Sequence, residues 1–404
     1  MAARSLLRNG DFRRLWLADG FSQFGNRVAV LAVPLLAATA LHASTFEVSL
    51  LRTVQTAAYL VLGLQAGAWC DRLRLRPLLI GTDLGQAVAF ASVPIAAAFG
   101  VLSLTQLYVV VGIAGVLAVF GTVAHQTYLP RLIGPDDLVE GNAKLYANLS
   151  VSAVAAPGAT GFLMQFLGGP AAIAVNAASF VWSALWLRGI RQPEVRPERT
   201  DRVPLRREIG EGIAFIVRHR VLRLFAGNTV QTALFQSTYM TLSVLYMLRE
   251  LRLSALGIGL LSAFGLTGAI AGSATAQRLG ARFGAGRTVW LSSLVLAAGY
   301  LVAPLSRPGW LIALYALGAF LCTFAITVAN VHMVSFIQAE TPAEMRGRVT
   351  ATNRFLIFGM GPIGSLAAGA LGETIGLRNT LWIGAAGTAA AALWLFPLRG
   401  QKES

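Results

Sequence analysis

Residues 104–124 read LTQLYVVVGIAGVLAVFGTVA and contain no charged side chain. A run of about 17 or more apolar residues is long enough for a helix to cross the hydrocarbon core of a bilayer, which is roughly 30 Å thick. On a helix, the apolar side chains of this stretch would cover nearly the whole circumference, and they do not alternate with polar ones as in a strand. In lipid, a helix satisfies its own backbone hydrogen bonds. This stretch therefore predicts a transmembrane helix.

The composition of the whole chain indicates many such helices. Hydrophobic residues make up 55% of the 404 residues and charged residues only 13%, whereas an ordinary soluble protein has about 25% charged residues. The two cysteines exclude a disulfide-stapled secreted scaffold, and the apolar runs exclude a disordered chain. The net charge of +15 comes in short bursts between apolar runs, with no single basic face, so we expect no nucleic-acid partner.

Twelve apolar runs are long enough, or nearly so, to cross a membrane. The first six are Leu15–Leu41, Phe46–Trp69, Leu78–Phe99, Leu104–Ala124, Leu145–Leu167 and Ala171–Leu187. The second six are Leu222–Leu248, Leu256–Leu279, Val289–Leu305, Trp310–Ile337, Phe355–Leu371 and Thr380–Leu398. The sequence thus predicts an all-α membrane protein with twelve transmembrane helices.

The basic residues set the expected orientation. Most of the 33 lie in the tails and in alternate connections, and the densest group lies between Arg188 and Arg223. Because cytoplasmic loops carry the excess of Lys and Arg, the sequence predicts both termini in the cytoplasm. The first apolar run is too long for the core of a cleavable signal, so we expect a multi-pass protein of a bacterial inner membrane.

The chain divides into two halves around a basic connection. We predict a first six-helix bundle over residues 1–187, a cytoplasmic linker over 188–221 and a second bundle over 222–404. The linker contains an amphipathic pattern with Ile209, Ile213, Ile216 and Val217 on one face and arginines opposite. This pattern predicts a helix that lies at the cytoplasmic membrane surface; the alternative is a solvated linker.

The two halves repeat one another at a shift of about 205 residues. Gly67 corresponds to Gly272, and Pro157 corresponds to Pro362. The stretch PDDLVEGNAKLYAN from Pro135 lies beside PAEMRGRVTATNR from Pro342. Two parallel repeats of six spans, joined by a basic hinge, are typical of secondary transporters.

The loop after the second span reads GAWCDRLRLRP over residues 67–77. Glycine, then three residues, then Asp-Arg with further basic residues resembles the corresponding loop of the major facilitator superfamily. The resemblance implies a conformational latch made of Gly67, Asp71, Arg72 and Arg76, with the Asp71 carboxylate near the positive N-terminus of a neighbouring helix. The second copy, at Gly272, has Ala276 in place of the acid.

Three further stretches are similar to the macrolide-efflux and siderophore-exporter branch of that superfamily. They are SQFGNRVAVLAVPLL from Ser22, REIGEGIAFIVRHRVLRL from Arg207, and PAEMRGRVTATNR from Pro342. The segment 358–364, FGMGPIG, resembles the antiporter signature but lies in span eleven; small-residue packing explains it equally well. Span four lacks the arginine that drug–proton antiporters of this type carry, so that relay assignment does not transfer.

Ionisable groups inside a membrane are costly and usually functional. Asp19, Gln23, Asn26 and Arg27 form one polar stripe on span one, which we expect to face a central cavity. The other candidate cavity residues are Arg52 and Gln55 on span two, Asp83 on span three, and Asn228, Gln231, Gln236 and Tyr239 on span seven.

We expect Asp19 and Arg27 to form the centre of proton coupling, with Asp83 as the rival carboxylate. The alternatives are that the two acids pair with arginines at helix ends and that Arg27 and Arg52 snorkel. His125 and His332 are more simply read as packed histidines.

The resemblance implies a secondary transporter that exports an amphipathic small molecule, such as a drug, a macrolide-like compound or a siderophore, in exchange for protons. A lipid or metabolite carrier of the same fold and a membrane sensor remain alternatives. The sequence contains no metal-ligand spacing, phosphate-binding loop or catalytic cluster, so we expect no enzyme activity, no ATP hydrolysis, and neither a cofactor nor a metal site. The expected partners are a small-molecule substrate, protons and the bilayer, and we expect a monomer.

Overall fold

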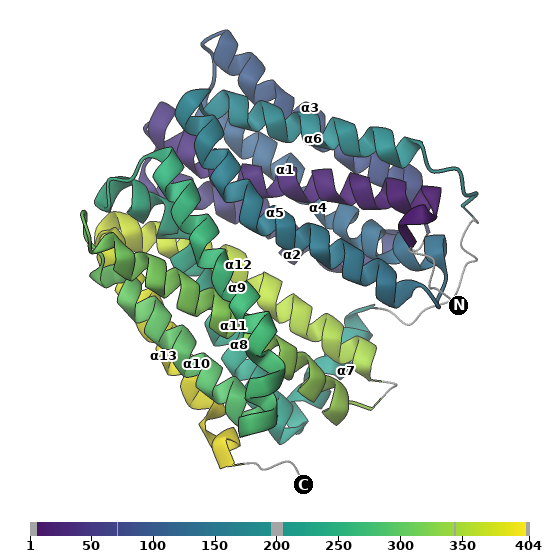
Figure 1. Ribbon diagram of the computed structural model, residues 1–404, viewed down its shortest axis with the longest axis vertical. Coiled ribbons are helices and arrows are strands. Elements are labelled where there is room, and N and C mark those ends of the chain that lie inside the picture. The colour runs from purple at the N-terminus through teal and green to yellow at the C-terminus, as the bar shows by residue number, and fades with distance from the viewer. Residues whose placement is uncertain (1–5, 71, 195–204, 343–344, 401–404) are drawn as a thin grey trace. The chain divides into compact units, whose positions relative to one another are not determined.

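The computed structural model describes residues 6–70, 72–194, 205–342 and 345–400, and over these residues the long regular elements are helices (Figure 1). The helices of the first half are α1 Gly10–Ala40, α2 Thr45–Cys70, α3 Leu75–Ala98, α4 Leu104–Ile133, α5 Leu138–Phe166 and α6 Gly169–Arg188. The linker helix is α7 Leu205–Arg218. The second half contains α8 Arg220–Leu245, α9 Ala255–Phe283, α10 Ala285–Val302, α11 Ile312–Glu340, α12 Arg346–Thr374 and α13 Leu377–Ala391. Short turns of other helix types are η1 Leu6–Arg8, η2 Tyr246–Glu250, η3 Ala303–Leu305 and η4 Ala392–Gly400.

The prediction of twelve transmembrane helices is confirmed. Ten helices of the described chain are long and apolar enough to cross a membrane. The other two predicted spans are α2 and α8, which form at the expected places with 26 residues each. At 1.5 Å per residue such a helix is about 39 Å long, which exceeds the thickness of the hydrocarbon core.

The sequence repeat is reproduced in how the helices pack. In the first half α1 packs against α5 and α6, and α3 packs against α4 and α6. In the second half the corresponding helix α8 packs against α12 and α13, and α10 packs against α11 and α13. The two halves therefore bury their apolar surfaces through the same set of helix pairs.

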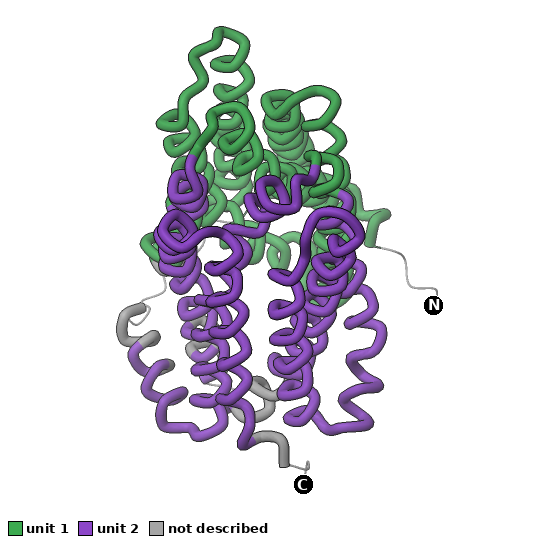
Figure 2. The backbone as a smooth tube through the Cα atoms, turned by 90° about the vertical axis from the view of Figure 1, so that its left-hand side faces the viewer, with its two compact units in different colours: residues 1–43, 54–201, 254–259 green, residues 44–53, 202–253, 260–404 purple. Residues whose placement is uncertain are grey.

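The chain forms two compact units (Figure 2). Unit 1 comprises residues 1–43, 54–201 and 254–259, and unit 2 comprises residues 44–53, 202–253 and 260–404. The division at 201/202 falls inside the predicted linker. The start of α9 is counted with unit 1 because Gly161 of α5 packs directly on the backbone of Ala255 and Gly259. Small residues of this kind let two transmembrane helices approach closely.

The predicted linker helix forms, as α7. Its apolar side is shared between two environments: Ile216 is buried against Leu222 of α8 and Val349 of α12, whereas Ile213 and Val217 are exposed. Ile209 is helical, but the surroundings of its side chain are outside what the structure describes. The two exposed apolar side chains fit the predicted contact with the membrane surface, which stays a prediction.

The glycine–proline segment of α12 is a packing site within unit 2. Gly364 lies directly against the backbone of Leu234 on α8, where an added Cβ would overlap. The hydroxyl of Ser237 donates to the carbonyl of Gly361 at 2.8 Å, and that of Thr238 donates to the carbonyl of Gly364 at 3.1 Å. In lipid, such hydroxyls satisfy backbone groups around a proline, so this contact fits the packing reading of residues 358–364.

Candidate functional site: a buried carboxylate in unit 1

The polar stripe predicted on span one forms on a continuous helix. Asp19 is only 6% exposed, and the amide nitrogen of Gln23, one turn further along α1, lies 3.4 Å from its Oδ1. Positions four apart on a helix face the same side, which is why the sequence spacing brought these two together. A charged carboxylate at this depth is costly unless other groups satisfy it.

Asn148 of α5 supplies the strongest contact to this carboxylate. Its amide nitrogen donates to Asp19 Oδ2 at 2.9 Å and to the backbone carbonyl of Trp16 at 2.7 Å. Asn148 is itself 9% exposed, and it packs beside Gly20 of α1. Nearby, the indole nitrogen of Trp16 donates to the carbonyl of Lys144. The amide thus joins α1 to α5 around the carboxylate.

His125 of α4 completes the cluster. Its Nε2 lies 3.6 Å from Asp19 Oδ1, and 23% of its side chain is exposed against 6% for Asp19. His125 lies eight residues before the end of α4 and Asp19 lies nine after the start of α1, so both are about 12–14 Å along the axis from those helix ends. Three helices of one unit therefore converge on one acid and one imidazole.

This arrangement can hold and exchange a proton. Among the described residues, His125 is the only basic side chain within ion-pair distance of Asp19. The pair is an ion pair when the imidazole is protonated, and it loses that attraction when the proton moves or leaves. Asp19 is enclosed and His125 is partly exposed, although the His125 Nε2 that faces the carboxylate is itself buried.

Arg27 lies on the same face of α1 two turns beyond Asp19, about 12 Å along the helix axis. Its side chain is half-buried near the middle of the helix. Within the described part of the chain, no hydrogen bond or ion pair is formed by its guanidinium. Asn26, beside it, is also half-buried. A cation at this depth without a protein partner is suited to an anionic group of a ligand.

The two candidates on α2 belong to different units. Arg52 is counted with unit 2 and Gln55 with unit 1, and both side chains are half-buried. The backbone of Gln55 packs directly against Gly115 of α4. Neither residue belongs to the cluster around Asp19, which is formed by side chains of α1, α4 and α5.

Asp83 lies on α3 and is not hydrogen-bonded to the Asp19 cluster within the described residues. It is 8% exposed, and its Oδ2 accepts a 2.6 Å hydrogen bond from Ser183 of α6. The alternative reading, in which Asp83 pairs with an arginine at a helix end, is not what the described residues show. Its carboxylate instead joins α3 to α6.

The predicted cavity residues of span seven are engaged inside unit 2. The amide of Asn228 donates to the carbonyl of Ala391, and that of Gln231 donates to Gly387 while accepting from Trp394. The ring of Tyr239 packs edge-on against Tyr300 at 4.5 Å between centroids. Gln236 is half-buried. Asn228, Gln231 and Tyr239 thus contribute to packing against α13, η4 or α10.

The predicted latch is described in part. Gly67 lies within α2, Arg72 is exposed in the turn that follows, and Asp71 lies outside the described residues. The guanidinium of Arg76 donates to the carbonyls of Leu187 and Arg188 at the end of α6. Arg76 therefore satisfies terminal carbonyls of α6 that have no partner within the helix.

Sequence reasoning missed Asn148 and gave His125 a packing role. A signal for Asn148 existed, because an asparagine ends the motif from Pro135 and another, Asn353, lies near the end of its second copy. His125 and His332 are likewise 207 positions apart. His332 does have a packing role, since its Nε2 lies 2.9 Å from the carbonyl of Ala276.

Comparison with known proteins identifies the family. Residues 15–365 match the sequence profile of the Major Facilitator Superfamily. The multidrug efflux pump Tap of Mycolicibacterium fortuitum is 29% identical over 370 residues, covering 88% of each chain. Tap of Mycobacterium tuberculosis is 25% identical and covers 88% of this chain and 85% of that one.

Solved transporter structures share the fold. A bacterial homologue of the iron transporter ferroportin superposes with a TM-score of 0.78 at 17% identity, covering 98% of this chain and all of the other. The nucleoside transporter NupG superposes with a TM-score of 0.79 at 13% identity, covering 97% and 99%. The family match spans most of the sequence, and the twelve helices pack as two repeated halves; the chain therefore belongs to the Major Facilitator Superfamily of membrane transporters.

Proposed function

We propose that this protein exports an amphipathic small molecule, such as a drug, a macrolide-like compound or a siderophore, across a bacterial inner membrane in exchange for protons. Support for the substrate class comes from the similarity to Tap proteins, which are multidrug efflux pumps, over 88% of this chain. Support for proton coupling comes from the cluster of Asp19, His125 and Asn148. Both termini lie in the cytoplasm in this proposal, as the distribution of arginines predicts. The protein acts as a monomer.

The observation that carries the coupling proposal is the 3.6 Å separation between His125 Nε2 and Asp19 Oδ1 inside unit 1. A proton entering from the periplasm binds this pair, and the gain of positive charge changes the contacts that hold α1 beside α4 and α5. When the cavity opens to the cytoplasm, the proton is released and the ion pair weakens. Each step leaves the pair with one proton more or one proton fewer, which is the requirement for exchange.

Substrate binding in this proposal uses Arg27 and the rest of the α1 stripe. Arg27 attracts an anionic or strongly polar group of the substrate, while apolar side chains around it accept the remainder. Gln23 links the two functions, because it lies between Arg27 and Asp19 on one helical face and bonds to the Asp19 carboxylate. Substrate and proton therefore act on the same helix.

Everted membrane vesicles provide the test of export. Vesicles containing the protein should accumulate some members of a panel of macrolides, other amphipathic drugs and siderophores when an inward-acid pH gradient is imposed. Vesicles from cells with an empty vector are the control for passive binding. Absence of accumulation for every compound, with the protein present in the membrane, would contradict the proposed function.

A further inference from the structure

A pocket of 880 Å³ lies between α3 and α6 in unit 1. This volume is within the range of about 300–1,000 Å³ that is usual for small-molecule sites. It is separate from the Asp19 cluster, because none of its lining residues comes from α1, α4 or α5. The two helices run side by side in Figure 1 and pack closely along their length.

One wall of the pocket is apolar and exposed. Ile80 and Leu84 lie one turn apart on α3, and Val181 and Leu185 lie one turn apart on α6. Because residues four apart share a helical face, each pair forms a short ridge. Leu84, Val181 and Leu185 are 45%, 42% and 56% exposed. Lipid tails are as apolar as leucine, so exposed ridges of this kind are suited to contact with lipid chains.

The other wall is strongly basic. Arg74 and Arg76 line it from the start of α3, and Arg188 and Arg191 line it from the end of α6 and the segment that follows. Glu194 is the one acid of the lining, which leaves a net charge of +3. Both Glu194 oxygens already accept hydrogen bonds from the backbone nitrogens of Leu75 and Arg76.

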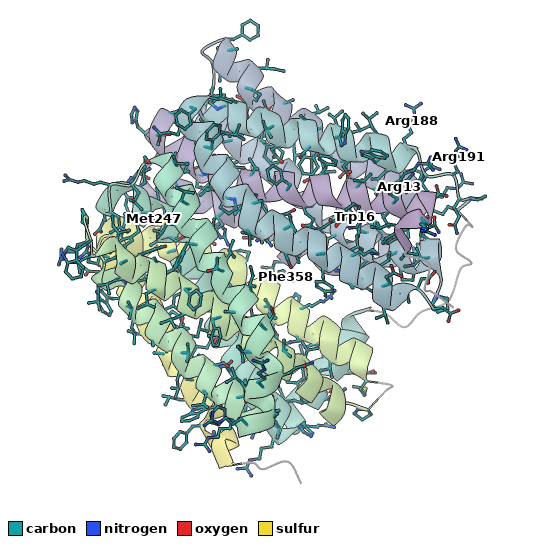
Figure 3. The ribbon with its side chains drawn as sticks, in the orientation of Figure 1. Arg13, Trp16, Arg188, Arg191, Met247 and Phe358 are labelled. Atoms are coloured by element: carbon teal, nitrogen blue, oxygen red, sulfur yellow. The ribbon has the colours of Figure 1, made fainter. Side chains whose placement is uncertain are left out.

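The guanidinium groups of Arg74, Arg188 and Arg191 have no ion pair or hydrogen bond within the described residues. Figure 3 shows Arg188 and Arg191 together at one end of the unit, at the same end as Arg13. The backbone that carries Arg191 is nevertheless fixed, because the nitrogens of Arg191 and Gln192 donate to the two oxygens of Asp11 at 3.1 and 3.0 Å. The basic wall is thus a built feature of the fold rather than a loose loop.

We propose that this pocket binds an anionic phospholipid of the cytoplasmic leaflet. The phosphate lies among Arg74, Arg188 and Arg191, and an acyl chain lies along Ile80, Leu84, Val181 and Leu185. Basic pockets between transmembrane helices on the cytoplasmic side are suited to such headgroups. Free phosphate would leave the apolar wall unused, and an uncharged lipid would leave the arginines unpaired. The inference goes beyond transport. From the proposed function it takes only the membrane topology, in which the basic ends of α3 and α6 lie on the cytoplasmic side.

Two variants test the two walls separately. The double variant Arg74→Gln with Arg188→Gln removes charge without removing a described contact. Gly81→Leu keeps every charge but fills the pocket, because Gly81 lines it and an added Cβ there meets nothing within 4 Å. The matched control is Arg282→Gln with Arg287→Gln, which removes two exposed arginines from the equivalent connection of the second half.

Binding is measured by native mass spectrometry of the purified full-length protein titrated with phosphatidylglycerol, with phosphatidylcholine of the same chains as the uncharged probe. We expect the Arg74/Arg188 double variant and Gly81→Leu each to weaken phosphatidylglycerol binding about tenfold or more. The control should stay within about twofold, and inorganic phosphate at millimolar concentration should not displace the lipid.

Three results would overturn the proposal. If the Arg282/Arg287 control lost as much phosphatidylglycerol binding as the Arg74/Arg188 double variant, the lipid would be held by the general positive charge of the surface. Full binding by Gly81→Leu would mean that the apolar wall takes no part. Displacement by inorganic phosphate would mean that the arginines form a site for free anions. None of these results depends on which substrate is exported, so failure here leaves the proposed function untouched.

Discussion

Asn148 donates one hydrogen bond to the Asp19 carboxylate at 2.9 Å and another, from the same amide nitrogen, to the carbonyl of Trp16 at 2.7 Å. The first bond is stronger when the carboxylate is charged, because charge-assisted hydrogen bonds exceed neutral ones. The charged form of Asp19, which a protonated His125 also favours, therefore holds α1 against α5. A chemical event at one side chain is in this way connected to the packing of two transmembrane helices.

Replacing the partner imidazole should change the pH dependence of transport. In His125→Asn, Asp19 loses the basic group 3.6 Å away, so the pH at which transport is half-maximal should shift while the protein still folds. His332→Asn is the matched control from the second half. This variant should lower the free energy of unfolding by about 1 kcal/mol, because the hydrogen bond to the carbonyl of Ala276 is lost. The pH dependence of transport should stay unchanged. An unchanged profile in His125→Asn would remove the histidine from the coupling site.

Arg27 should recognise a charged group of the substrate. Arg27→Gln should raise the KM for an anionic or zwitterionic substrate about tenfold, because hydrogen bonds to charged groups contribute about 1.5–3 kcal/mol. Arg27→Lys should restore part of the loss, since it keeps the charge but not the planar donor geometry. Transport rates over a range of substrate concentrations measure this. If both variants keep the KM of the unmodified protein, Arg27 does not contact the substrate.

The positions of the helices could be predicted from the sequence, because each span must satisfy its own backbone within lipid and therefore needs a long apolar run. The bond between Asp19 and Gln23 was also predictable, since residues four apart share a helical face. Asn148 and His125 come from other helices, and the spacing along one helix does not specify which neighbour it meets. Recognising their role required the packing of α1 against α4 and α5.

Spacing along one helix also could not show that the polar residues of span seven pack against a neighbouring helix. Asn228 and Gln231 form a polar stripe in the sequence, and a stripe shows only that one face needs partners. In the structure their amides find backbone carbonyls of α13, at Ala391 and Gly387. A carbonyl that accepts such a bond is available on every helix, so the sequence does not distinguish a packed amide from one that faces a cavity.

An ion pair in unit 2 should contribute to stability. Arg378 donates to Glu250 Oε2 at 3.0 Å and to the carbonyl of Ser306, and it lies 5.7 Å from the ring centre of Tyr246. Arg378→Ala should destabilise the protein by about 1 kcal/mol, because the pair is partly exposed and screened. Arg307→Ala, which removes the exposed arginine that follows Ser306, is the control. Equal melting temperatures for the two variants in the same detergent would contradict this.

We predict that Asp71, a residue of the predicted latch, acts on conformational exchange rather than on binding. Its place in the sequence motif that follows the second span, away from the expected middle of the membrane, predicts that Asp71→Asn slows transport and leaves substrate affinity largely intact. Binding and transport must be measured on the same preparation. Equal loss of both would make Asp71 a binding residue.

Proton coupling by Asp19 is tested most directly by comparing two carboxylates in one assay. Asp19 lies beside the partly exposed His125, whereas Asp83 is bonded to Ser183 between α3 and α6. The assay is substrate accumulation in everted vesicles as a function of the imposed pH gradient, with equal amounts of Asp19→Asn and Asp83→Asn in the membrane. We expect Asp19→Asn to abolish accumulation driven by the gradient and Asp83→Asn to retain it. Retention by Asp19→Asn together with loss in Asp83→Asn would assign coupling to α3 and contradict the role proposed for Asp19.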